Sequence, residues 1–155
     1  MDVPVVTAAG LKGDTSLFQS LWLQACHQDF LDVLFGERNV GVLQPLVHGE
    51  GLAIITPRWM KHILSERTLP RFVKYGINVF GIDANLDKWE IARKAIDETY
   101  KFIESIGIPM HLREVGIDDS RLDEMAHHIA VNEGLENAYV PLSEQDIQEI
   151  LVASL

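Results

Sequence analysis

The sequence predicts an all-α fold, a helical bundle of five or six helices. Several segments repeat their apolar residues every three or four positions, which is the spacing of one helical face. Glycine and proline separate these segments, so the connections are short, and strand-like alternation is scarce. Of the 155 residues, 47% are hydrophobic and 23% are charged, values typical of one globular domain with a substantial core.

The first third of the chain carries one helical signal. Residues 1 to 14 show no clear period and are expected to form an extended or frayed lead-in. Residues 16 to 35 place their apolar side chains on one broad helical face, which predicts a helix. Residues 36 to 41, GERNVG, end this helix, and Pro45 makes the segment after them extended or a connector.

A buried helix is expected to begin near His48. Residues 52 to 55, LAII, are apolar all round, as at the start of a helix inside a core. Gly49 and Gly51 lack Cβ atoms, so the backbone there can take unusual torsions or let another group approach closely. Taken alone, His48 is either an ordinary hydrogen-bonded loop histidine or a side chain that faces a cavity, and both interpretations stay open.

Two helices are predicted in the middle of the chain. The first is capped by Ser65, tolerates Pro70 near its first turn and ends at Gly81. Its predicted buried side consists of Phe72, Val73, Ile77, Val79 and Phe80. The second starts at or just before Asp87 and stops at Gly107. Its predicted inward residues are Ile91, Ala92, Ala95, Ile96, Thr99, Phe102, Ile103 and Ile106.

The last third predicts two more helices. Residues 110 to 117 are expected to form a connector rather than a strand, and residues 118 to 131 an amphipathic helix that Gly134 ends. Its predicted inward residues are Leu122, Met125, Ala126, Ile129 and Ala130. Ser143 and Asp146 form a capping-box pattern, with Asp in place of Glu, that introduces the final helix.

Composition excludes several classes of partner. The net charge of −10 and the pI near 4.9 would repel a phosphate backbone, so nucleic acid is not an expected partner. One cysteine, Cys26, forms no internal disulfide, which is consistent with a reducing compartment. A secretory leader and a long apolar span are both missing from the sequence. We therefore expect a cytoplasmic protein that does not contact a membrane.

Residue chemistry alone assigns no activity. The six histidines are His27, His48, His62, His111, His127 and His128. No two stand four residues apart, the spacing that puts two imidazoles on one helical face. We expect His127 and His128 at solvated or rim positions, His62 at the surface or between helices, and His111 in a connector without a special role. Nucleotide-binding and serine-hydrolase motifs do not occur.

Five stretches, in order, resemble the C-terminal helical domain of the iron-containing alcohol dehydrogenases, in the branch of the NAD(P)H-dependent butanol dehydrogenases. They are HGEGLAIITPRWMKHIL, RFVKYGINVFGID, the helix from Trp89 to Ile106 with SIGIP, LREVGIDDSRLDEMA and VPLSEQDIQEIL. The resemblance covers residues 48 to 155, a dehydrogenase-like helical domain. Residues 1 to 47 are then a divergent N-terminal segment with one predicted helix, arising naturally or from an altered reading frame.

The resemblance implies a metal site. In this family iron, in some members zinc, lies in the cleft between an N-terminal dinucleotide-binding domain and the helical domain. His48, which opens HGEGLA, is implied to be the last of the metal ligands. Such a metal acts as a Lewis acid on a small alcohol or aldehyde while NAD(P)H exchanges hydride with it.

The other implied ligands do not stand at their expected places. An Asp and a His four residues apart, and the glycine-rich motif for the cofactor pyrophosphate, belong to a part of the family that precedes this chain. Counting back from His48, the third ligand and a histidine that aids proton movement fall on Leu34 and Arg38, which suit neither task. His27, beside Cys26, is a second candidate ligand, which needs an insertion in the alignment.

Two functions follow as hypotheses. The first is a partial iron-containing alcohol dehydrogenase, which on its own is expected to lack turnover. The alternative is a non-catalytic helical module that binds a partner or a separately encoded nucleotide-binding half. Apolar residues such as Trp22 and Phe35 suggest an interface of this kind, with a second copy or with the missing N-terminal domain.

Overall fold

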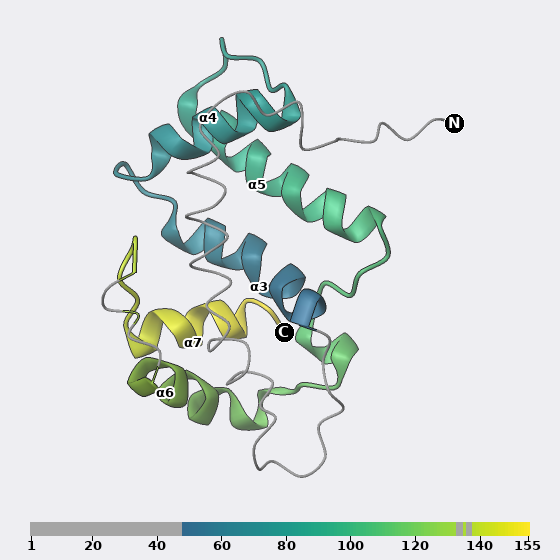
Figure 1. The fold of residues 1–155 in the computed structure, drawn as a ribbon, viewed down its shortest axis with the longest axis vertical. Helices are drawn as coiled ribbons and strands as arrows, with labels where there is room; N and C mark the ends of the chain where they lie inside the picture. Colours follow the sequence, from purple (N-terminus) through teal and green to yellow (C-terminus); the bar gives the residue numbers. More distant parts are fainter. Residues whose placement is uncertain (1–47, 133–134, 136–137) are drawn as a thin grey trace.

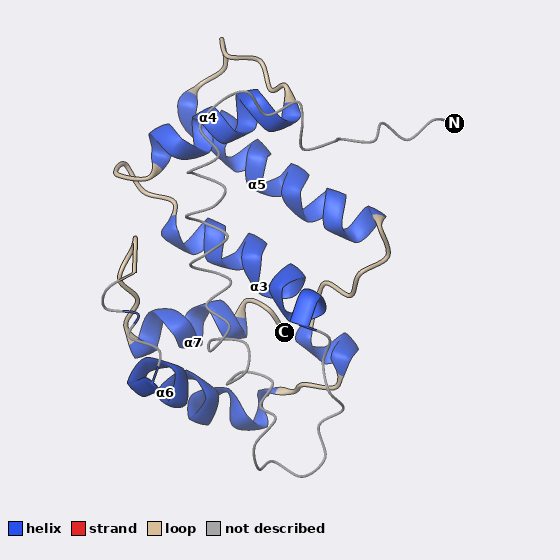
Figure 2. Cartoon of the chain, in the orientation of Figure 1, coloured by secondary structure: helices blue, strands red, loops and turns tan. Residues whose placement is uncertain are grey.

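The computed structural model describes residues 48–132, 135 and 138–155, and these residues are helical or lie in short connections. Within these residues, five α-helices and two short 3-10 helices follow one another. They are α3 (His48–Ile63), α4 (Leu69–Phe80), α5 (Lys88–Ser105), η2 (Leu112–Val115), η3 (Asp119–Arg121), α6 (Leu122–Asn132) and α7 (Glu144–Val152). Figure 2 shows no strand within this part of the chain, so the predicted all-α fold is confirmed. The helix predicted at residues 16 to 35 lies outside the described residues.

Helix α3 occupies the middle of the described fold. In Figure 1, α4 and α5 lie side by side on one side of α3, and α6 and α7 lie side by side on the other. Contacts with α5 and with α7 join α3 to both pairs. The fold is therefore two helical pairs joined by one central helix. None of the described helices is both long and apolar enough to cross a membrane.

The buried start predicted for the central helix is confirmed. Seven hydrophobic residues of α3 are at most 9% exposed, and they are Leu52, Ala53, Ile54, Ile55, Trp59, Met60 and Ile63. The helix continues through Pro57, whose missing N–H leaves one carbonyl of the preceding turn without its helical donor. That carbonyl belongs to Ala53. At the neighbouring position, the Arg58 guanidinium donates to the Ile54 carbonyl at 3.0 Å.

The turn between α3 and α4 differs from the prediction. Thr68, and not Ser65, occupies the N-cap position of α4, although its side chain makes no capping bond. The Thr68 hydroxyl is 1% exposed, donates to the Ile63 carbonyl at 2.8 Å and accepts the Ser65 N–H at 2.8 Å. This hydroxyl closes the turn by joining it to the end of α3, so the helix begins three residues later than expected. Pro70 lies in the first turn, as predicted.

Helix α4 ends at its predicted signal, and helix α5 begins at its own. Gly81 ends α4 in the left-handed conformation, with φ of 64°. Asp87 caps α5 and accepts the N–H groups of Trp89 at 2.9 Å and Glu90 at 3.2 Å. Gly76 of α4 lies against α5, and a Cβ atom there would come within 3.0 Å of an Ile91 methyl group. The absence of a side chain therefore sets how closely these two helices approach.

A partly buried hydrogen bond also joins this pair of helices. The Tyr75 hydroxyl lies 2.8 Å from the Thr99 hydroxyl, which donates its own proton to the Ala95 carbonyl at 2.8 Å. Tyr75 is therefore the donor in the bond between the two side chains. Burial raises the pKa of the Tyr75 hydroxyl, so the phenol keeps the proton that this bond needs.

Three residues predicted to face inward are exposed instead. Phe102 is 60% exposed, Ile106 57% and Val79 46%. Helix α5 has 18 residues and α4 has 12, so α5 is about 9 Å longer and its last turns have no α4 residues opposite them. Val79 lies in the last turn of α4, next to its final residue Phe80.

The C-terminal part agrees with its prediction. Residues 110 to 117 form a connector with the short helix η2, and the Leu112 N–H donates to the Ser154 carbonyl at 2.8 Å. The predicted helix over 118 to 131 begins as η3 and continues as α6. Three of its predicted inward residues are buried, namely Leu122, Ala126 and Ile129. Met125 and Ala130 are partly buried and pack on the core. Gly134 lies outside the described residues.

Candidate functional site

The predicted metal ligand stands at the start of the central helix. His48 is the first residue of α3, and its side chain lies outside what the structure describes. Gly49 and Gly51 both belong to the helix, and neither has a positive φ, so the unusual torsions considered for them do not occur. Among the described residues, no atom comes within 4 Å of the place where a Gly49 Cβ would lie. The ligand assignments of His48 and of His27, which also lies outside the described residues, stay predictions.

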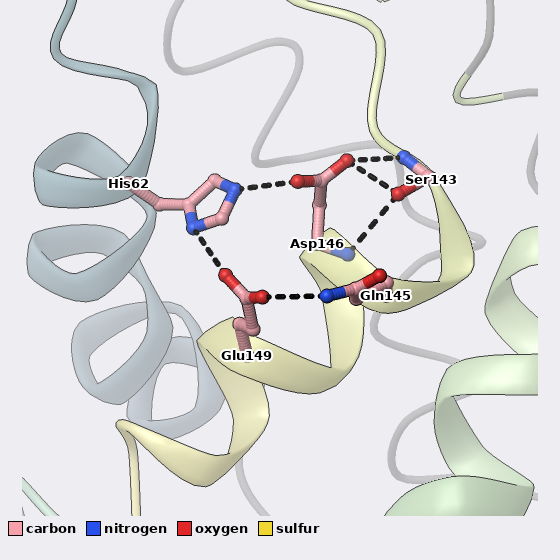
Figure 3. A network of polar contacts seen from close by, with 5 residues as sticks. All are labelled: His62, Ser143, Gln145, Asp146 and Glu149. Atoms are coloured by element: carbon pink, nitrogen blue, oxygen red, sulfur yellow. Dashed lines mark hydrogen bonds and ion pairs between the residues drawn. The ribbon is translucent and has the colours of Figure 1, made fainter.

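A polar cluster stands at the opposite end of the same helix. His62, in the last turn of α3, faces two carboxylates of α7 (Figure 3). The His62 Nε2 lies 3.0 Å from Oδ1 of Asp146, and Nδ1 lies 3.8 Å from Oε2 of Glu149. The side chains are 23%, 37% and 56% exposed, in the order His62, Asp146, Glu149. Of the two places expected for His62, the structure selects the position between helices.

The first turn of α7 holds Asp146 in place. The Ser143 hydroxyl accepts the Asp146 N–H at 3.2 Å, while Oδ2 of Asp146 accepts the Ser143 N–H at 2.8 Å and its hydroxyl at 2.6 Å. The predicted capping box is thus confirmed. These bonds from Ser143, followed by the contact with His62, lower the pKa of the Asp146 carboxyl below its usual value. Asp146 is therefore a fixed negative charge at neutral pH.

Glu149 is oriented by its own helix. The Gln145 amide, one turn earlier on α7, donates to Oε1 of Glu149 at 3.1 Å. The other carboxylate oxygen faces the His62 ring (Figure 3). Each of the two carboxylates therefore uses one oxygen to bind within α7 and directs the other oxygen toward α3.

The remaining described histidines lie at the surface. His127 and His128 are exposed, as predicted, and the Nδ1 of His127 lies 3.2 Å from a Glu144 oxygen. His111 is exposed beside η2. Its backbone N–H donates at 2.8 Å to Glu114. The bond from the Met110 N–H, followed by this bond, lowers the pKa of the Glu114 carboxyl. None of these contacts requires a catalytic role.

The two ends of α3 are separate sites. His48 and His62 stand fourteen positions apart, which corresponds to about 21 Å along a helix. Within the described residues, the group of metal-ligating side chains close enough to share an ion is His62, Asp146 and Glu149. These residues do not assemble a ligand set beside His48. The sequence did not reveal the cluster because His62 and Asp146 are 84 residues apart, although the D-x-x-E spacing of Asp146 and Glu149 could be recognised.

Both the sequence and the fold match known dehydrogenases. The family model of the Fe-containing alcohol dehydrogenase family, C-terminal, matches residues 37–155. This match includes residues 37 to 47, which were expected to belong to a divergent segment, and the position of the domain boundary stays a prediction.

Individual relatives agree with the family model. NADH-dependent butanol dehydrogenase A of Clostridium acetobutylicum is 45% identical over 119 residues, which are 76% of this chain and 31% of that protein. NADH-dependent butanol dehydrogenase B of the same organism is 36% identical over 121 residues, which are 77% of this chain and 31% of that protein.

A solved structure supports the same assignment. The crystal structure of NADH-dependent butanol dehydrogenase A from Thermotoga maritima matches with a TM-score of 0.65 at 27% identity. The match covers 84% of this chain and 32% of the Thermotoga chain. The chain thus spans about a third of the length of the relatives that it matches. Since the family model covers most of the chain, the protein belongs to the iron-containing alcohol dehydrogenase family and carries that family's C-terminal domain.

Proposed function

We propose that this chain supplies the helical side of a metal-dependent alcohol dehydrogenase centre. The observation that carries the proposal is the family match over residues 37–155, which includes His48, the position that the resemblance assigns to the last metal ligand. The reaction is the interconversion of a small alcohol and its aldehyde, with hydride exchanged with NAD(P)H. Both Clostridium relatives are named as NADH-dependent enzymes, which favours NADH.

The described residues do not by themselves fit the family's iron. The one group with several ligating side chains lies about 21 Å along α3 from His48. Iron or zinc, when bound in the family's cleft, would supply a Lewis acid. We place its other ligands and the nicotinamide site outside the helical domain, and assign no reaction step to the described side chains. His27 is kept as a second candidate ligand.

The isolated chain is expected to lack turnover. A reaction centre needs the nicotinamide and the carbonyl held together in one geometry, which one ligand without a nucleotide site does not provide. The measurement is the absorbance of NADH or NADPH after the purified chain is mixed with ferrous iron and butanal. Robust, metal-dependent oxidation of the cofactor would contradict this expectation.

His48→Ala is expected to reduce the iron held by the purified chain. Removing an imidazole ligand removes one metal bond, and metal analysis of both proteins at equal free iron measures the loss. His111→Ala is the control, because His111 is an exposed histidine beside η2. Equal iron contents in wild type and His48→Ala would show that His48 is not a ligand.

The alternative is a non-catalytic module that binds a partner or a separately encoded nucleotide-binding half. Trp22 and Phe35, which suggested it, lie outside the described residues, but Phe102 and Ile106 are large apolar side chains exposed on α5. A monodisperse monomer without dye-accessible apolar surface would count against this function. The expected cytoplasmic location, the lack of a nucleic-acid partner and the dimer stay predictions.

A further inference from the structure

His62 has a carboxylate in front of each of its ring nitrogens. A neutral imidazole has one donor and one acceptor nitrogen, so it satisfies only one of two such carboxylates. The 3.0 Å contact between Nε2 and Asp146 is a hydrogen bond, whereas the 3.8 Å between Nδ1 and Glu149 is too long for one. In the neutral ring the Nδ1 lone pair therefore faces a negative oxygen, and a cation between them would relieve this repulsion.

The distance between Nδ1 and Glu149 suits a shared metal ion. Zinc binds imidazole nitrogen and carboxylate oxygen at about 2.0–2.2 Å, so two ligands of a tetrahedral ion lie about 3.4 Å apart. The observed 3.8 Å exceeds this value by a few tenths of an ångström. Glu149 is 56% exposed and can move by this amount through a side-chain rotation.

Asp146 completes the arrangement from the other side of the ring. By accepting the Nε2 proton, it fixes the tautomer in which Nδ1 carries a lone pair toward Glu149. A metal-bound histidine characteristically donates its second N–H to a carboxylate in this way, which orients the ring and raises its basicity. Ser143 anchors the Asp146 carboxylate through two hydrogen bonds at its other oxygen, so the ring is held by a fixed partner.

We propose that His62 and Glu149 bind a divalent transition-metal ion, with zinc as the representative, at the junction of α3 and α7. His62 contributes Nδ1, Glu149 contributes a carboxylate oxygen, Asp146 orients the imidazole, and water completes the coordination. The ion links the last turn of the central helix to the C-terminal helix, so it stabilises the folded domain. The site is distinct from the position of His48 and does not depend on the proposed function.

The matched comparison within the chain is His127. Both histidines contact a carboxylate of α7, but His127 is 66% exposed and meets Glu144 through Nδ1 alone. His62 is 23% exposed, and the two carboxylates approach its two different nitrogens. A surface histidine that merely lies near acidic groups would behave like His127.

The test is zinc titration of the full chain by calorimetry, paired with thermal unfolding in zinc and in a chelator. All proteins carry His48→Ala, so zinc at the family's metal position does not contribute. His62→Gln and Glu149→Gln are each expected to weaken zinc binding by about tenfold or more and to abolish the rise in Tm that zinc produces. His127→Gln is expected to retain both the affinity and the rise.

Asp146→Asn separates orientation from ligation. It should weaken zinc binding by about 10–100-fold, because the ring loses its carboxylate partner but keeps its nitrogen. If His62→Gln fails to fold in chelator, the result for Glu149→Gln tests the proposal, because Glu149 is largely exposed and its substitution should leave the fold intact. The proposal would be overturned if Glu149→Gln left the zinc affinity and the rise in Tm unchanged. It would also be overturned if His127→Gln lost both to the same extent as Glu149→Gln. If the heat of zinc binding were the same with and without Glu149, the contact between His62 and Glu149 would not be a metal site, and the proposal would be wrong.

Discussion

Phe72→Ala is expected to lower the free energy of unfolding by about 3–5 kcal/mol. Phe72 is 2% exposed, lies on α4 and belongs to the buried cluster that includes residues of α3 and α5. Removing its ring loses apolar burial and leaves a cavity that the surrounding helices fill only in part. Because a domain of this size is stable by about 5–15 kcal/mol, the change removes a large share of its stability.

The measurement is urea unfolding followed by helical circular dichroism. Phe102→Ala is the matched control, because it removes the same ring from a position that is 60% exposed. We expect the control to change the free energy of unfolding by about 0.5 kcal/mol or less. Equal effects of the two substitutions would mean that α4 does not pack on the core as described.

Gly76→Leu is expected to destabilise the protein by about 1–3 kcal/mol, although leucine is the better helix former. A Cβ atom on Gly76 would lie 3.0 Å from an Ile91 methyl group, 3.1 Å from the Ala95 Cβ and 3.2 Å from the Ile82 Cδ1. The remaining carbons of leucine would have to enter the contact between α4 and α5, so these helices would be forced apart. The same unfolding experiment measures the loss.

Asn78→Leu is the control for the glycine substitution. Asn78 lies on the same helix at an exposed position, so leucine there gains helix propensity without crowding a neighbour. We expect a change within about 0.5 kcal/mol. A stabilising Gly76→Leu would show that α4 and α5 are separated more widely than the structure places them.

Features set by a few neighbouring residues could be predicted from the sequence. Asp87 and Ser143 cap their helices through backbone groups two or three residues away, and Gly81 ends α4 by its own conformational freedom. Each of these signals lies within one helical turn. The order of the described helices followed from such signals together with apolar periodicity.

Features that depend on distant partners could not be predicted in this way. Whether Phe102 is buried or exposed depends on how far α4 extends along α5, and helical periodicity does not predict that length. Phe102 is in fact exposed. Thr68 replaced Ser65 as the N-cap residue because its hydroxyl bonds to the end of α3. The contact of His62 with Asp146 joins residues 84 positions apart, and it becomes visible only when α3 and α7 are packed together.

The family assignment followed from resemblance more than from residue chemistry. His48 carried no signal of its own, because a single histidine beside glycines is compatible with a structural role. The order and spacing of five stretches identified the family, which the match over residues 37–155 confirms. The ligand role of His48 depends on partner ligands that a single helix cannot supply. Metal analysis of wild type and His48→Ala tests this role.

The central position of α3 also has a consequence for folding during synthesis. Helices α4 and α5 adjoin in the chain and pack on each other, as do α6 and α7, so each pair can form soon after its residues leave the ribosome. Helix α3 is made before both pairs, yet its packing is complete only when α7 has emerged. Its apolar surface must therefore stay uncovered until α7 has been made, and this helix is where a nascent chain is most exposed to aggregation or chaperone capture.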